Sequence, residues 1–154
     1  DQRLDVGGQH AAGVEVGQSA AIHGLTDDTV AAGTPIDEAL PVVLEALRGR
    51  VLLAHYTDIE ERFLSAACER VYGTRLPVAR IDTLELHRRL IVGWGQEPMR
   101  LALRLWAARE RYGLPDYRAH ECLIDAIACA ELYLAQVAEM RSHGDSVTLA
   151  RLVS

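Results

Sequence analysis

The sequence contains no lysine and a single phenylalanine, and aromatic residues make up only 5% of it. Leu, Val, Ile and Ala must therefore fill any core. No apolar run approaches the ~18 to 20 residues of a membrane-spanning helix, and no basic start followed by an apolar stretch indicates a signal peptide. Three cysteines, an odd number, suit reduced thiols better than a disulfide framework. We expect a cytoplasmic protein with no membrane partner.

The chain has 154 residues, 49% hydrophobic and 25% charged, which is enough for a single domain over residues 1–154. Its net charge of −6 argues against a protein that coats nucleic acid. The charge is uneven, because residues 75–118 carry nine Arg against five acidic residues. An acidic centre beside a basic strip suits a metal-dependent enzyme acting on a polyanion. Charge alone favours a simpler interpretation, a solvated helix face that carries Arg100, Arg104, Arg109 and Arg111.

Strands and helices alternate along the sequence. Short apolar runs predict buried strands at Val51–Ala54 and Leu76–Ile81. Helical spacing predicts helices at about 36–47, Ile59–Tyr72, 83–90 (capped by Asp82 or Thr83), Met99–Tyr112 and Ala119–Arg141. This alternation is typical of an α/β layered domain. Two strands are too few for such a sheet, and the missing ones should precede Ile22, where only Val14–Val16 is a candidate.

Two segments combine polar side chains in a way that suggests chemistry. The predicted strand ending at Ala54 leads into His55, Asp58 and Glu60, and ligands bind at the carboxyl ends of strands in open α/β sheets. Asp58 could instead cap the following helix. In the second segment, His120 precedes Asp125, a carboxylate set among apolar residues, where it is costly unless bonded or metal-bound. Spacing alone leaves open a functional pair or two unrelated residues.

Together with a third segment, these residues resemble the DEDDh family of 3′-5′ exonucleases, which includes the proofreading epsilon subunit of bacterial replicative polymerases and ribonuclease T. The family pattern IHGIT is similar to Ile22–Thr26, AHNxxFDxxFL to Ala54–Leu64, DTL to Asp82–Leu84, and HxAxxDA to His120–Ala126. The resemblance covers about residues 19–138.

The sequence departs from the family pattern at two places. Glu60 stands where the family has Asp, and Asp58 falls two residues too early to replace it. The first motif, Asp-x-Glu on an opening strand, is not found in the chain. Either strands carrying it precede Asp1 or this is a degenerate member; we favour the first, since the fold otherwise lacks its central strands.

The resemblance implies a ribonuclease H-like α/β domain, a mixed sheet with helices on both faces. Glu60, His120 and Asp125 would converge at one end of the sheet. Asp125 and Glu60 would ligate Mg²⁺ or Mn²⁺ in a two-metal site, and His120 would be the general base. His23, Gly24 and His55 would bind the 3′-terminal nucleotide.

The implied function is metal-dependent removal of nucleotides from 3′ ends of single-stranded DNA or RNA, with a polymerase or a second copy as further partners. The alternative is a catalytically silent exonuclease fold that binds nucleic acid or protein. The missing Asp-x-Glu favours the silent fold, whereas His120 beside Asp125 favours the enzyme. Without Asp-x-Glu, we expect this chain to hold Mg²⁺ or Mn²⁺ weakly or not at all.

Overall fold

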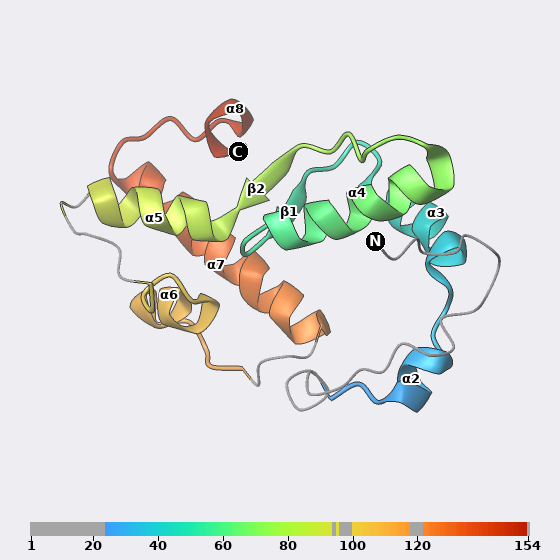
Figure 1. The fold of residues 1–154 in the computed structure, drawn as a ribbon. Helices are drawn as coiled ribbons and strands as arrows, with labels where there is room; N and C mark the ends of the chain where they lie inside the picture. The colour runs from blue at the N-terminus through green and yellow to red at the C-terminus, as the bar shows by residue number, and fades with distance from the viewer. Residues whose placement is uncertain (1–23, 94, 96–99, 118–121, 154) are drawn as a thin grey trace.

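The computed structural model describes residues 24–93, 95, 100–117 and 122–153. His23, His120 and the predicted strand at Val14–Val16 lie outside these residues. The elements, shown in Figure 1, are α2 (Asp27–Ala31), α3 (Ile36–Leu47), β1 (Leu52–Ala54), α4 (Asp58–Tyr72), β2 (Arg80–Asp82), α5 (Thr83–Gly93), α6 (Leu105–Arg111), α7 (Cys122–Ser142) and α8 (Leu149–Leu152).

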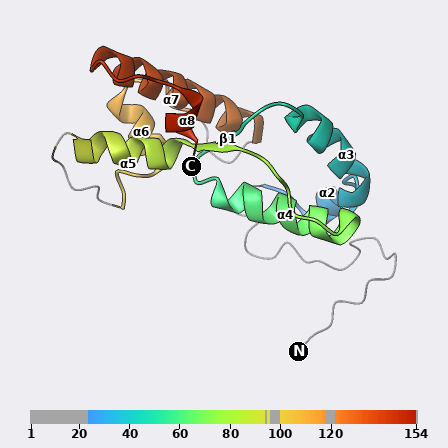
Figure 2. The same ribbon diagram turned by 90° about the horizontal axis from the view of Figure 1, so that it is seen from above.

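The strands β1 and β2 pair in parallel, with Leu52 opposite Arg80 and Ala54 opposite Asp82. In Figure 2, α4 lies on one side of the strands and α7 on the other. The α/β class with helices on both faces is therefore confirmed around these two strands. The described residues hold no third strand, so the antiparallel part of the expected mixed sheet is not among them.

Two apolar clusters hold these elements together. The first joins α3 to α4 through Leu40, Ala67 and Cys68. The second joins β2 and α5 to the C-terminal α8 through Ile81, Leu86 and Leu152. No helix in the described part of the chain is both long and apolar enough to cross a bilayer.

The buried faces of α4 and α7 differ from those expected. Helical spacing in the sequence predicts that Phe63 points inward and that Leu123 and Leu134 lie on one apolar stripe, yet Phe63 and Leu123 are 66% and 68% exposed, and Leu134 is exposed as well. Smaller or polar residues are buried instead, among them Ser65 and Cys129. The prediction failed because a single helical stripe was assumed, whereas the neighbours of a helix decide which face is covered.

Two predicted elements are shorter or shifted. The helix expected over Met99–Tyr112 is reduced to α6, because the carbonyl of Leu103 bonds the ring of His55 instead of continuing a helix. The strand expected at Leu76–Ile81 lies at Arg80–Asp82, since Leu76 packs against the α3–α4 cluster. In both places a tertiary contact overrides the local pattern.

The buried carboxylate of Asp82 joins the two strand–helix units. Its Oδ1 accepts hydrogen bonds from the backbone N–H groups of Tyr56 and Leu84, both at 2.9 Å. Its Oδ2 accepts from Thr57 through the backbone N–H at 2.9 Å and the hydroxyl at 3.2 Å. The expected capping of α5 by Asp82 is thus confirmed, and the same side chain also fixes the turn between β1 and α4.

We predict that Asp82→Ala lowers the free energy of unfolding by about 3 to 5 kcal/mol, because it removes a cap and leaves buried amides unpaired. The matched control is Asp58→Ala, since Asp58 is half-exposed and forms an ion pair with Arg80. That change should cost less than about 1 kcal/mol. Urea unfolding followed by circular dichroism measures both, and equal losses would contradict the role of Asp82.

His87 is a buried imidazole on α5 whose ring centre lies 6.3 Å from that of Tyr112. Burial lowers its pKa to about 4, with smaller contributions from the positive charge of Arg111 and from the neighbouring His55. The ring is therefore neutral near neutral pH. In the unfolded chain the same ring has a pKa of about 6.5.

Between these two pKa values His87 is protonated in the unfolded chain but not in the folded protein. The free energy of unfolding therefore decreases as the pH falls from about 6.5 towards 4. The loss attributable to His87 is up to about 3 kcal/mol. We predict that His87→Gln makes this decline shallower. Urea midpoints at about pH 7 and about pH 5 test it, and an unchanged difference between the two midpoints would contradict it.

Candidate functional site

The carboxyl ends of β1 and β2 lie side by side, which brings His55 against Thr83 and Leu103. The Nε2 atom of His55 lies 2.9 Å from the carbonyl oxygen of Leu103, and its Nδ1 lies 2.9 Å from the Thr83 hydroxyl. Because a carbonyl only accepts, Nε2 carries the proton and Nδ1 of the neutral ring accepts from Thr83. Burial lowers the pKa of His55, although the Leu103 carbonyl and Asp82 oppose this, and favours the neutral ring.

His55 therefore anchors the segment before α6 to the end of β2. Both of its ring nitrogens are hydrogen-bonded within the protein. A substrate would therefore contact the carbon atoms of the ring or have to displace one of these hydrogen-bond partners. Its predicted role in substrate binding stays a prediction. The structure adds a positioning role, because His55 is tied to Thr83, a fully buried residue at the start of α5.

Glu60 and Glu61, adjacent in the first turn of α4, have contrasting surroundings. The Glu61 carboxylate accepts from the Ser65 hydroxyl at 2.9 Å and from Arg75 at 3.0 Å. Arg75 and Ser65 lower the pKa of Glu61. By contrast, Oε2 of Glu60 is buried and has no hydrogen-bond partner among the described residues. A buried carboxylate oxygen without a partner is costly, and it is an atom able to ligate a cation.

Asp125 lies in the first turn of α7, partly buried, and one turn before Cys129 on the same helix face. The Cys129 sulfur lies 3.6 Å from the Thr83 hydroxyl, so this face is turned towards the ends of the strands. Burial raises the pKa of the Cys129 thiol, and the charges of Asp82 and Glu60 raise it further. Glu60 is thus close enough to Cys129 for its charge to affect the thiol. The convergence of both carboxylates with His120 stays a prediction.

The two carboxylates fit a hard divalent cation in their chemistry, since Mg²⁺ and Mn²⁺ prefer oxygen ligands. The unpartnered Oε2 of Glu60 is the observation that supports this fit. Within the described residues no group of three or more His, Cys, Asp or Glu side chains forms a complete metal site. His120 and the residues before Gly24 fall outside that search, so the two-metal arrangement stays a prediction.

Arg109 was expected on a solvated helix face, and this expectation is wrong: the residue is only 4% exposed. Its guanidinium donates to the carbonyls of Ala128 and Pro115 and to the Glu131 carboxylate, and it lies 4.8 Å from the Tyr117 ring centre. Arg109 therefore holds the segment that contains Pro115 and Tyr117 against α7. Arg100, Arg104 and Arg111 are exposed, as expected.

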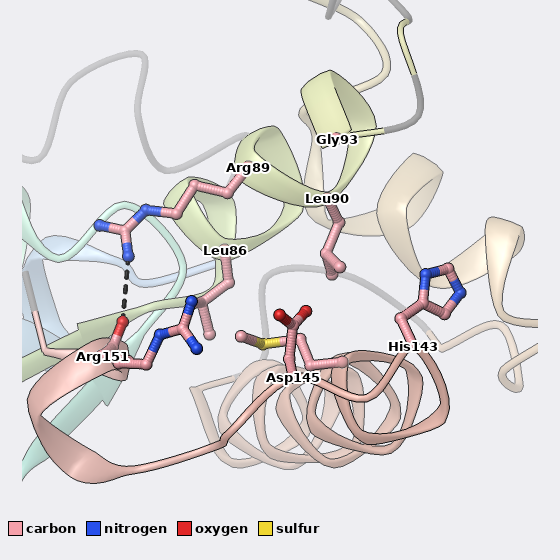
Figure 3. Close-up of a pocket in the computed structure, with 8 residues that line it drawn as sticks. Leu86, Arg89, Leu90, Gly93, His143, Asp145 and Arg151 are labelled. Atoms are coloured by element: carbon pink, nitrogen blue, oxygen red, sulfur yellow. Dashed lines mark hydrogen bonds between the residues drawn. The ribbon is translucent and has the colours of Figure 1, made fainter.

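A pocket of about 410 Å³ lies at the other ends of α5 and α7, away from these carboxylates (Figure 3). Leu86 and Leu90 of α5 line it with Met140, Arg89 and Arg151. The Arg89 guanidinium donates to the Arg151 carbonyl at 3.2 Å and to Glu85. The pocket is lined by the later residues of α5 and by Met140 near the end of α7, whereas Asp125 lies in the first turn of α7, so the pocket is not part of the candidate site.

Two parallel strands with helices on both faces, and acidic side chains near their carboxyl ends, are consistent with a ribonuclease H-like α/β domain. A family model described as "Exonuclease" matches residues 17–133. The chain belongs to this exonuclease family.

Curated relatives are named "DNA polymerase III PolC-type". The chain is 31% identical over 127 residues to the one from Thermotoga petrophila and 30% identical over 130 residues to the one from Thermotoga maritima. Each match covers 82% of this chain and 9% of the relative. A Staphylococcus aureus relative is 24% identical over 120 residues, which is 78% of this chain and 8% of that protein. The chain therefore spans less than a tenth of these relatives.

We predict that Glu60→Gln leaves the free energy of unfolding unchanged or raises it by up to about 1 kcal/mol, because it neutralises a carboxylate with an unpaired buried oxygen. Glu61→Gln is the matched control and should lower stability, since it weakens bonds to Arg75 and Ser65. Urea unfolding without added divalent cations measures both. A larger loss for Glu60→Gln than for Glu61→Gln would show that Glu60 has a structural partner.

Proposed function

We propose that the protein is a metal-dependent 3′-5′ exonuclease acting on single-stranded ends of DNA or RNA. The observation that carries this proposal is the buried carboxylate oxygen of Glu60, which has no hydrogen-bond partner in the part of the chain that the structure describes. Membership of the exonuclease family supports it. Association with a polymerase or a second copy, a cytoplasmic location and action as one domain belong to the same proposal.

Asp125 and Glu60 are the residues that would hold Mg²⁺ or Mn²⁺. When bound, such ions lower the pKa of water and stabilise charge on the attacked phosphate and the leaving oxygen. His120, as a neutral imidazole, accepts the proton of the attacking water. The water oxygen bonds to phosphorus while the bond to the 3′ oxygen of the preceding nucleotide breaks, and that oxygen takes up a proton. His23, Gly24 and His55 lie beside the terminal nucleotide in this proposal.

Glu60 reaches one methylene further than the Asp of the family pattern. The longer side chain loses more rotamer freedom when it is fixed, and a catalytic site tolerates only about 0.5 Å of looseness. No Asp-x-Glu on an opening strand is found in the 154 residues, and the carboxylates of that motif would complete the ligand set. We therefore expect weak cation binding by this chain and activity only at high Mn²⁺ concentration.

A catalytically silent nucleic-acid-binding or protein-interaction module is the second candidate. The missing Asp-x-Glu favours it, because a site without these carboxylates can retain a groove for a strand while losing the cleavage step. The two candidates differ in whether bound oligonucleotide is shortened.

The test is Mn²⁺-dependent shortening of a 5′-labelled single-stranded oligonucleotide, which shows a ladder when nucleotides leave from the 3′ end. We predict that Asp125→Ala abolishes shortening, whereas Glu60→Asp is tolerated. His120→Ala should slow cleavage by about a hundredfold or more, because a general base contributes about that factor, yet spare Mn²⁺ binding measured by calorimetry.

Glu61→Gln serves as the neighbouring-carboxylate control and should retain cleavage. Undiminished cleavage by Asp125→Ala would refute the mechanism. Binding of the oligonucleotide without shortening at any Mn²⁺ concentration would support the silent module instead.

A further inference from the structure

Tyr56 has a backbone conformation that tyrosine rarely adopts. Its φ is +71°, and it is the one non-glycine residue with positive φ in the described part of the chain. For a bulky side chain this left-handed conformation is strained, whereas Gly and Asn adopt it readily. Residues held in such conformations cluster at functional sites, where the surrounding structure enforces them.

The structure around Tyr56 does enforce this conformation. The Tyr56 N–H donates to the buried Asp82 carboxylate at 2.9 Å, and both the N–H and the hydroxyl of Thr57 donate to the same group. On the other side, both ring nitrogens of His55 are bonded. The carbonyl of Tyr56 accepts from Ile59 at 3.3 Å as α4 begins. Tyr56 is thus fixed on both sides within a rigid turn.

The side chain of Tyr56 projects from this turn into solvent. It is 46% exposed, while its neighbours are held inside: Thr57 is 1% exposed and His55 is partly buried. Ile59, 61% exposed, follows three residues later and provides an apolar flank. Glu60, a candidate metal ligand, follows Tyr56 by four residues, in the first turn of α4, so the held backbone of Tyr56 adjoins the segment that carries the candidate site. Burial of Tyr56 does not explain why an aromatic residue occupies this strained position.

From this geometry we propose that Tyr56 is a substrate-positioning residue whose ring stacks on the 3′-terminal base of a single-stranded nucleic acid. This inference rests on the proposed exonuclease function and adds a contact to it. A rigid ring loses little entropy on binding, and every base offers a flat face, so the contact is tolerant of sequence. Stacking would hold the last base while the phosphate that precedes it lies at the carboxylates.

The experiment separates strain from stacking. Tyr56→Asn removes the ring but suits the left-handed backbone, so it should raise the urea midpoint while weakening oligonucleotide binding by roughly five- to a hundredfold. Tyr56→Phe keeps the ring and should bind within about twofold of the parent chain. Tyr72→Asn is the control for losing an exposed tyrosine, because Tyr72 is 49% exposed at the far end of α4.

Binding is measured by fluorescence anisotropy of a 5′-labelled oligothymidylate in EDTA, so cleavage is not required. A second probe has an abasic nucleotide at its 3′ end. The parent chain should bind this probe more weakly than the intact one, and Tyr56→Asn should bind both probes equally. A gain in stability with no loss of binding by Tyr56→Asn would overturn the stacking role and leave the exonuclease proposal standing. If the parent chain binds neither probe, both proposals are overturned.

Discussion

The carboxylate of Asp82 is the constraint on which the site depends. The strands β1 and β2 contain only three residues each, so their ladder alone holds the two strand–helix units weakly. Asp82 ends β2 opposite Ala54, the last residue of β1, and its two oxygens bind the turn after β1 and the first turn of α5. A single buried charge therefore sets the positions of His55, Tyr56 and the start of α4.

A second helix reaches the same point from the opposite side of the strands. Gln136 of α7 donates to the carbonyl of Thr83 at 2.8 Å, and Cys129 contacts the Thr83 hydroxyl. Arg109 then ties α6 and the segment after it to α7. These polar contacts lie around Thr83, which is fully buried and shared by His55 and α7. The carboxylates of Glu60 and Asp125 are thus carried by helices that are each anchored at the strand ends.

The hydrophobic periodicity of the sequence predicted where helices and strands lie along the chain better than it predicted which of their faces are buried. The bounds of α3, β1 and α4 follow from apolar spacing and from glycines such as Gly73, whose φ is +71°. The buried faces of α4 and α7 could not be predicted, because they depend on which elements cover each helix. Burial of Arg109 was missed for the same reason. The candidate residues came from motif order, but the unpaired oxygen of Glu60 and the strained backbone of Tyr56 are visible only in three dimensions.

Glu60 and Tyr56 share a property that links stability to function. Each is a local cost, one a buried oxygen without a partner and the other a left-handed aromatic residue, and each lies within one turn of the Asp82 anchor. Their neighbours in sequence differ, since Glu61 is bonded to Ser65 and Arg75 and Thr57 is bonded twice to Asp82. Because strain and unpaired groups persist where structure over-determines them, the Asp82 contacts supply the rigidity that both residues require. A ligand that binds the Glu60 oxygen would remove the cost of leaving that oxygen unpaired. If the same ligand covers the Tyr56 ring, the strained backbone of Tyr56 would serve to hold a binding contact.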